Sequence, residues 1–413
     1  MEGAHFSFSA LLEIAGMKSE HPQIRYHGLD ALRGAMMLLG IYLHASVAYA
    51  NVGGWPWKDE TRTSAYDISI GLIHFFRMPA FYVMAGFFAA LLIDRKGIQA
   101  FIRNRASRVL LPFLAGWCVL YTVVQALAFY GSTWKQPDVL EWLWHFLGSG
   151  RFLKYPHPMH LWFLEYLILL YVITIVIVKV LRGVLTEGLR ERMNLGFRCV
   201  LQSALAPFLL AVPTLVTLMF MKSGVLDDPP SFIPVPRIVG AYLVFFGFGW
   251  MLYSNRELLS GLSQRAWGLA ALGGLAFAAS GFAYFRLPPN KEFGAMLCLF
   301  LGSQAVVTWS LILGLIGLFL RYLDRPIPWM RYLSDSSYYL YLAHMPVLLV
   351  AQLALARYEL PASAKMWIAL LCAVPILLVT YHFLVRPTWV GMMLNGRRYP
   401  EGTLFNHRRA DRS

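Results

Sequence analysis

The first long apolar stretch of the chain contains an arginine and a histidine at helical spacing. Arg33 and His44 are eleven residues apart, so on an α-helix their side chains point within about 20° of each other and lie about 16 Å apart along the axis. Asp30 is one turn from Arg33 and can pair with it. Because charged groups inside apolar helices usually face a protein interior or water, this stripe predicts a functional site. The alternatives are a packing histidine and an arginine that only anchors the helix end.

The second apolar stretch contains His74 and Arg77, which are three residues apart and therefore share a helix face. Arg77 stands among phenylalanines and a methionine, where a guanidinium needs a partner or water. We expect it either to act in function or to form a structural ion pair with another helix. Ala85 and Gly86 follow, and small residues of this kind permit close helix approach.

Two further arginines, Arg105 and Arg108, are one turn apart just before the third apolar stretch. Two guanidiniums on one face suit a phosphate-rich ligand, because each planar group can donate parallel hydrogen bonds to phosphate oxygens. The alternative is that both arginines only mark the cytoplasmic end of a membrane helix.

Polar residues also interrupt two later apolar stretches. His160, Trp162 and Glu165 open one of them, and a glutamate just inside a span beside a histidine indicates a polar cavity open to the outside. Tyr341 and His344 share a face of the other. The alternatives are a surface carboxylate among interfacial aromatics for Glu165 and a packing histidine near a proline for His344.

The composition indicates which elements hold these side chains. Of the 413 residues, 58% are hydrophobic and only 14% are charged, whereas about one-quarter charged is usual for soluble proteins. A run of roughly 20 apolar residues can cross a membrane. The predicted fold class is therefore all-α, a polytopic transmembrane bundle of about ten helices. The predicted spans are 29–50, 68–93, 109–130, 161–181, 200–221, 236–253, 267–285, 299–320, 332–355 and 366–385.

The distribution of positive charge predicts the orientation of this bundle. If the N-terminus is cytoplasmic, the inner segments hold roughly two-thirds of the 36 lysines and arginines. Both termini are then cytoplasmic, and the net charge of +14 reflects topology and contact with the anionic lipid bilayer rather than nucleic acid. We expect a multi-pass protein of the bacterial inner (cytoplasmic) membrane, with a cytoplasmic segment at 1–28, a membrane domain at 29–390 and a basic cytoplasmic tail at 391–413.

Other kinds of site lack support in the sequence. The chain contains no HExxH zinc pattern and no phosphate-binding glycine loop. Its four cysteines have no paired spacing, which argues against a disulfide framework or a zinc site. We therefore expect no metal and no permanently bound cofactor.

These motifs together resemble membrane acyltransferase family three. In that family the first helix carries a leucine and an aspartate, then an arginine and a glycine, then a histidine eleven residues after the arginine. Leu29-Asp30, Arg33-Gly34 and His44 match this pattern in order and spacing.

The resemblance extends beyond the first helix. The family's RxxR pattern near the third helix is matched by Arg105 and Arg108. The stretches 160–164 and 337–344 fit its later helices, and the resemblance covers about residues 25–390.

Within the family, the stretch from His74 to Pro79 and the ten-helix layout are similar to a branch that is taken to succinylate osmoregulated periplasmic glucans. One departure is Ala85, where related proteins often have serine before the glycine, so a hydroxyl has no role there. The resemblance implies an integral membrane O-acyltransferase. It would move a succinyl or acetyl group from cytoplasmic acyl-CoA, the co-substrate, to a hydroxyl of an extracytoplasmic glycan such as periplasmic glucan.

The resemblance also implies roles for the residues named above. His44 would be the base for the hydroxyl, and Arg33, Arg105 and Arg108 would hold the phosphates of CoA. Arg77 would stabilise the oxyanion or pair with a dicarboxylic acyl chain, and both roles stay open. Further expected site residues are Glu165 in catalysis and, in substrate binding, His74, His160, Trp162, Tyr341 and His344.

A transporter or flippase for a glycan or related solute is the main alternative, because the same buried charges could serve as a proton and substrate relay. A purely structural or sensory membrane protein is a third interpretation. Direct acyl transfer and transfer through an acyl-histidine intermediate are both compatible with the sequence.

Overall fold

The structure is a computed structural model, which describes residues 25–132, 141, 144–145, 148, 156–184, 186–222, 224–229, 231–288, 294–396 and 398–399. Within these residues the chain is helical and contains no strand, as the composition predicts. Most of the predicted terminal segments 1–28 and 391–413 lies outside the described residues.

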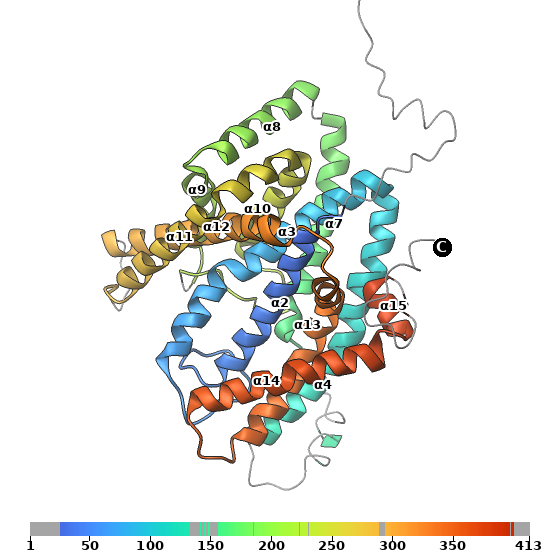
Figure 1. The fold of residues 1–413 in the computed structure, drawn as a ribbon, viewed down its shortest axis with the longest axis vertical. Coiled ribbons are helices and arrows are strands. Elements are labelled where there is room, and N and C mark those ends of the chain that lie inside the picture. The colour runs from blue at the N-terminus through green and yellow to red at the C-terminus, as the bar shows by residue number, and fades with distance from the viewer. Residues whose placement is uncertain are drawn as a thin grey trace, which may run out of the picture.

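Figure 1 shows how the helices are arranged. Their bounds are α2 His27–Val47, α3 Ser64–Arg105, α4 Leu111–Ser132, α7 Trp162–Val184, α8 Glu187–Gln202, α9 Ala206–Met219, α10 Pro236–Ser254, α11 Leu259–Tyr284, α12 Ala295–Leu323, α13 Pro328–Leu355, α14 Ala362–Thr380 and α15 Trp389–Asn395. Two π-helical segments, Ala106–Leu110 and Tyr381–Val385, join α3 to α4 and follow α14, and two short 3-10 turns lie at Met159–Leu161 and Arg256–Leu258.

Seven helical stretches among the described residues are long and apolar enough to cross a membrane, or eight if the bent pair of α8 and α9 forms one span. The stretch Ser64–Gly131 counts as one of the seven although it contains both α3 and most of α4. Each of the ten predicted spans overlaps a helix. Ten membrane crossings and the cytoplasmic position of both termini stay predictions.

The predicted span 200–221 is divided by a sharp bend. α8 and α9 meet at 114° across the break between Gln202 and Ala206. Ser203 adopts an extended backbone there, and Pro207 stands in the first turn of α9, where its missing N–H costs no hydrogen bond. Because α8 is largely exposed and rich in charged residues, the apolar helix at this place begins only with α9.

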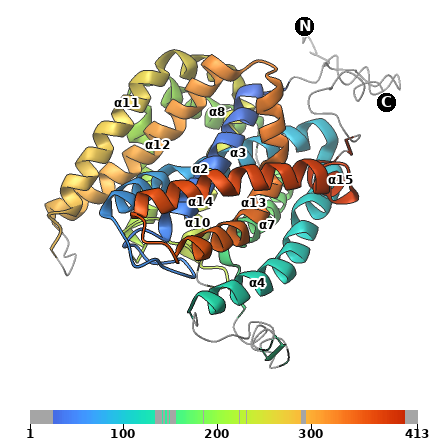
Figure 2. The ribbon, with the colours of Figure 1, turned by 60° about the horizontal axis from the view of Figure 1, so that its bottom comes forward.

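Helix α2 lies inside the bundle, in contact with α3, α12, α13 and α14. Figure 2 shows α14 crossing in front of α2 and α13, while the antiparallel pair α11 and α12 forms one side of the molecule. Side chains on several sides of α2, such as Leu32, Met36 and Ile41, are buried. Other helices therefore surround much of α2, and this shielding lowers the cost of placing Arg33 and His44 there.

Helices α3 and α10 approach closely at two glycines. A Cβ atom added to Gly86 would come within 2.0 Å of the carbonyl oxygen of Phe246, and one added to Gly249 would come within 1.9 Å of the carbonyl oxygen of Val83. Neither position has room for a side chain. The prediction that the small residues after Arg77 permit close helix approach is confirmed, and the contact fixes α3 against α10.

The start of α2 lies at an end of the bundle that is rich in arginine. The backbone N–H of Gly28 donates to the carboxylate of Asp324 after α12, at 2.9 Å, and Arg33 bonds Ser334 in α13. We call this region the basic end. It includes the arginines Arg25, Arg33, Arg105, Arg108, Arg331 and Arg386.

Candidate functional site

Three of the predicted site residues form one cluster. The ring centroids of His44 and His344 are 5.1 Å apart, and those of His344 and His160 are also 5.1 Å apart. His44 belongs to α2, His344 to α13, and His160 to the 3-10 turn before α7. His160 and His344 are only 7% and 3% exposed. We call these three residues the histidine cluster; the fold assembles it from distant parts of the chain.

Backbone carbonyls determine the protonation pattern of two of these rings. Nδ1 of His344 lies 2.8 Å from the carbonyl oxygen of Tyr341 and 3.0 Å from that of Leu340. A carbonyl only accepts, so Nδ1 carries the hydrogen and Nε2 keeps its lone pair. By the same reasoning, Nε2 of His160 donates to the carbonyl of Leu342 at 3.3 Å, and Nδ1 keeps the lone pair.

The nitrogens that keep their lone pairs have no partner in the part of the chain that the structure describes. They are Nε2 of His344 and Nδ1 of His160, and Nδ1 of His44 is likewise buried without a hydrogen bond. Buried polar atoms are nearly always paired in folded proteins. The cluster is therefore a set of proton-accepting groups that a bound substrate can complete.

Tryptophan Trp55 covers the cluster on the side of the loop 48–63. Its ring stacks on that of His44 with centroids 5.2 Å apart, and its indole N–H donates to the side-chain oxygen of Gln352 at 2.8 Å. The amide of Gln352 donates in turn to the carbonyls of His44 and Ala45. Trp55 and Gln352 were not predicted from the sequence, although a glutamine buried in an apolar helix is itself a signal.

Two lysines hold this loop in place. Lys58 donates to the carbonyl oxygens of Val47 and Ala50 at the end of α2, where a cation is favoured by the helix dipole; burial lowers the pKa of its ammonium group. Lys365 of α14 pairs with Asp59 at 3.0 Å, and their side chains are 4% and 3% exposed. These contacts join the loop to the end of α2 and to α14, next to His44.

The guanidinium of Arg77 lies one helical turn from His44 along α2. A Cβ atom on Gly40 would come within 2.5 Å of Nη1 of Arg77, so only glycine leaves room for the arginine there. Nη2 faces the sulfur of Met78 at 3.3 Å, while Nε and Nη1 are buried without a partner among the described residues. The structural ion pair considered for Arg77 is not formed with any described residue.

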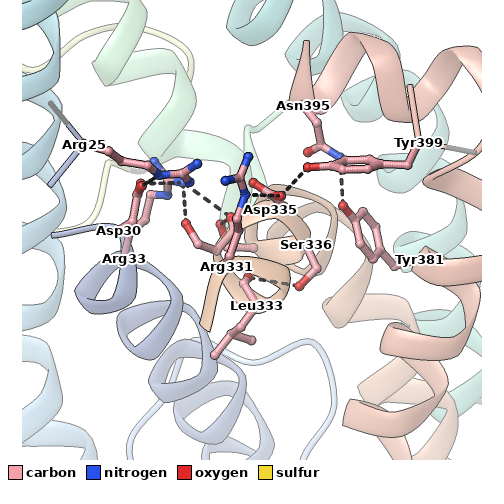
Figure 3. A network of polar contacts seen from close by, with 12 residues as sticks. Arg25, Asp30, Arg33, Arg331, Leu333, Asp335, Ser336, Tyr381, Asn395 and Tyr399 are labelled. Carbon is pink, nitrogen blue, oxygen red and sulfur yellow. Dashed lines mark hydrogen bonds and ion pairs between the residues drawn. The ribbon is translucent and has the colours of Figure 1, made fainter. Parts of the chain in front are cut away.

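Arg33 belongs to a polar network at the basic end (Figure 3). Its guanidinium lies 3.2 Å from Asp30 and donates to the hydroxyl of Ser334 at 2.6 Å. Asp30 also accepts from Arg25 at 2.7 Å. The predicted Asp30–Arg33 pair is thus formed, and the buried Nε of Arg33 has no partner within the described chain.

Arg105 and Arg108 contact different elements. The guanidinium of Arg105 lies over the rings of Phe101 and Tyr171, 5.3 Å and 5.1 Å from their centroids. Arg108 lies so close to Gly396, which follows α15, that a Cβ atom there would clash with the guanidinium. The π-helical turn 106–110 begins between them, and its extra residue per turn changes the direction of the second arginine relative to a regular helix.

The chain matches the family described as acyltransferase domain over residues 26–385. It belongs to this family. Two relatives are the proteins named glucans biosynthesis protein C from Escherichia coli K12 / DH10B and from Escherichia coli O6:K15:H31 (strain 536 / UPEC). They are 23% identical over 393 and 391 residues, and each comparison covers 91% of this chain and 96% of the relative. No solved structure matches the chain.

These comparisons confirm the resemblance found in the sequence. The acyltransferase family and the apolar helices together make this chain a multi-pass membrane acyltransferase. The glucan branch inferred from the stretch at His74 is the one to which both relatives belong by name.

Three further predicted residues belong to α13 and α7: Tyr341 is in α13 with His344, and Trp162 and Glu165 are in the first turn of α7, directly after His160. Tyr341 donates its hydroxyl hydrogen to the carbonyl oxygen of His160 at 2.5 Å, which holds the turn that carries this histidine. Trp162 packs against the rings of Tyr166 and Tyr242. Glu165 has a buried oxygen without a partner among the described residues.

His74 is separated from the histidine cluster and lines a cavity instead. Its Nε2 donates to the carbonyl oxygen of Leu226 at 2.9 Å. Leu226 belongs to the segment between α9 and α10, which the sequence analysis did not single out as part of a site.

Proposed function

We propose that this acyltransferase moves a succinyl or acetyl group from cytoplasmic acyl-CoA to a hydroxyl of an extracytoplasmic glycan such as periplasmic glucan, in the bacterial inner membrane. One observation carries the proposal: unpartnered nitrogens of the histidine cluster lie beside a buried, unpaired guanidinium. Acyl transfer needs this combination, a base for the hydroxyl and hydrogen-bond donors for the oxyanion.

His44 acts as the base in this proposal. In the direct route, the hydroxyl oxygen bonds to the thioester carbonyl carbon while its proton passes to a nitrogen of His44. The C–S bond then breaks, and the same proton passes to sulfur, so that CoA leaves as a thiol. His344 and His160 add further hydrogen-bond acceptors beside His44, because the lone pairs of His344 Nε2 and His160 Nδ1 have no partner among the described residues.

Arg77 stabilises the charge that develops on the carbonyl oxygen. Its Nε–H and one Nη1–H have no acceptor among the described residues, so they are available without breaking an existing hydrogen bond. Preorganised donors of this kind lower the energy of an oxyanion more than mobile water does. If the acyl group is succinyl, its free carboxylate offers Arg77 a second partner, and this alternative stays open.

The basic end holds the phosphates of acyl-CoA through Arg33, Arg105 and Arg108. Phosphate oxygens accept charge-assisted hydrogen bonds from guanidinium groups, and the buried Nε atoms of Arg33 and Arg105 have no partner in the described part of the chain. Arg33 and His44 are eleven residues apart on one helix, which is about 16 Å. The extended pantetheine arm of CoA is suited to span such a distance.

The experiment supplies membranes with acyl-CoA that is labelled in the acyl group, together with a glucan acceptor. We expect thioester cleavage and label on the glucan in the wild type, and neither in His44→Ala. His382→Ala is the matched control, because His382 lies after α14 and packs on Phe383 and Tyr332. Full transfer in correctly inserted His44→Ala would refute His44 as the base.

A transporter or flippase is the second candidate, favoured by the ionisable groups that follow α2 from Arg33 to His44. It predicts that glucan crosses the membrane of sealed vesicles while no acyl-CoA is consumed.

A separate experiment distinguishes the two routes of acyl transfer. Trapping of labelled acyl-His44 in the absence of glucan, detected by mass spectrometry of peptides, separates the covalent route from direct transfer.

A further inference from the structure

A cavity of about 340 Å³ lies between α3 and the segment that joins α9 to α10. Its volume falls in the range of ordinary small-molecule sites. Its polar lining consists of His74, Lys222, Asp227, Asp228 and Arg237. We call it the outer cavity. Lys222 and Asp228 are exposed at the surface.

The lining leaves hydrogen-bond acceptors unused. Asp227 is held by Arg237 at 3.3 Å and by the backbone N–H of Lys222 at 3.1 Å. The carboxylate of Asp228 makes no hydrogen bond or ion pair with a described residue. His74 donates through Nε2 to Leu226, so its Nδ1 is an acceptor. A ligand with several hydroxyl hydrogens fits these groups.

The charged side chains of the lining balance one another. Two carboxylates, Asp227 and Asp228, balance two cations, Lys222 and Arg237. A neutral sugar can donate hydroxyl hydrogens to Asp228, whereas the lining has no excess of cations to attract a phosphate or carboxylate ligand. The apolar side chains of Val225 and Leu226 offer a surface for the C–H face of a sugar ring.

The outer cavity is connected to the proposed reaction site through α3. His74 is one turn from Arg77, and the charge of Asp228 acts on Arg77. Arg77 in turn lies against Gly40, one turn before His44 on α2. The cavity therefore lies about one helical turn along α3 from the guanidinium that the proposed function assigns to the oxyanion.

We propose that the outer cavity binds a neutral, hydroxyl-rich sugar ring of the acceptor glycan, with the Asp228 carboxylate and Nδ1 of His74 accepting hydrogen bonds from its hydroxyls. This inference rests on the proposed function for its identification of the ligand as the acceptor. The lining residues Lys222, Asp228 and Arg237 then set which glycan the enzyme accepts.

The test measures binding of a gluco-oligosaccharide to the purified full-length protein in lipid nanodiscs by calorimetry. We expect Asp228→Asn to weaken binding about tenfold, because a charge-assisted hydrogen bond is lost. The control is Glu359→Gln, which neutralises an exposed carboxylate on the loop between α13 and α14 and should bind like the wild type. Val225→Trp, which fills the cavity without changing its charge, should also weaken binding.

Acyl-transfer kinetics on the same variants separate the two proposals. If the wild type binds the oligosaccharide and Asp228→Asn does not, while no variant transfers an acyl group, the cavity stands and the proposed function fails. If the wild type transfers but Asp228→Asn and Val225→Trp keep the wild-type Kd and KM for the glucan, the cavity proposal is overturned. Equal displacement of the sugar by inorganic phosphate would also overturn it, since the site would then be an anion site.

Discussion

The basic end and the surroundings of the histidine cluster differ in how fully their buried polar groups are paired. At the basic end, Arg33 bonds both Asp30 and Ser334, and neighbouring residues continue this network (Figure 3). In and beside the histidine cluster, His344 Nε2 and both Nε and Nη1 of Arg77 lack partners among the described residues, whereas Arg33 leaves only its Nε unpaired. An unpaired buried group costs stability, so its presence indicates a site that a ligand completes. Ion pairs and hydrogen bonds within the protein therefore hold much of the basic end and leave only single Nε atoms of Arg33 and Arg105 for a ligand, whereas no ion pair with a described residue holds Arg77 beside the histidine cluster.

The sharpest test of this comparison is removal of the unpaired guanidinium. We expect Arg77→Met to lower kcat for acyl transfer about 10³-fold, because an oxyanion donor is lost from a dry site. The KM for acyl-CoA should stay close to the wild-type value. Arg62→Met, at an exposed loop position, is the control. Wild-type kcat in Arg77→Met would show that its unpaired state has no catalytic meaning.

A second test concerns the paired charges above the cluster. Asp59→Asn leaves Lys365 as a buried, unpaired cation, and we expect a loss of about 3 kcal/mol in the free energy of unfolding. The double variant Asp59→Leu with Lys365→Met should recover most of this loss, since it removes both charges. Thermal unfolding in detergent measures both. Equal stability of Asp59→Asn and the wild type would mean that the pair is solvated.

A third test moves Arg77 without replacing it. Gly40→Ala places a Cβ atom within 2.5 Å of Nη1, so the guanidinium must shift. We expect kcat to fall about 10²-fold, which is the usual effect of moving a catalytic group by about 1 Å. Gly71→Ala is the matched control, because a Cβ atom there meets nothing within 4 Å. If both variants have the same kcat, the position of the guanidinium is not critical.

The smallest expected effect lies at the basic end. We expect Arg33→Gln to raise the KM for acyl-CoA about tenfold through loss of a charge-assisted hydrogen bond to phosphate, with a smaller change in kcat. Arg331→Gln removes the same charge from the same end, where Arg331 lies 3.9 Å from Asp335. Steady-state kinetics with varied acyl-CoA should separate the two variants. The same KM in both would assign Arg33 a purely structural role.

Much of the helical fold was predictable because hydrophobicity acts locally. A chain with 58% hydrophobic residues must satisfy its backbone hydrogen bonds inside lipid, and helices do so within each segment. The shared helix face of Arg33 and His44 was also predictable, because it depends only on the spacing of two residues within one helix. The bend between α8 and α9 was not predicted, because the span estimate averages hydropathy over the polar break at Ser203.

The candidate site was predictable only in part. His44, His160 and His344 each stood out as polar residues in apolar surroundings, but nothing local shows that their rings meet. The directions of Arg105 and Arg108 also escaped prediction, because a single π-helical turn between them alters the helical register.

By itself, the sequence determined that this chain is a helical membrane protein. It also determined which polar residues lie in its apolar helices and which family motifs those residues form. Tertiary structure alone decided which of those residues face one another, that Trp55 and Gln352 cover His44, and that Arg77 fits beside Gly40. The physical reason is distance along the chain. Helical periodicity determines which residues of one helix share a face. Contacts between helices depend instead on side-chain packing between elements far apart in sequence.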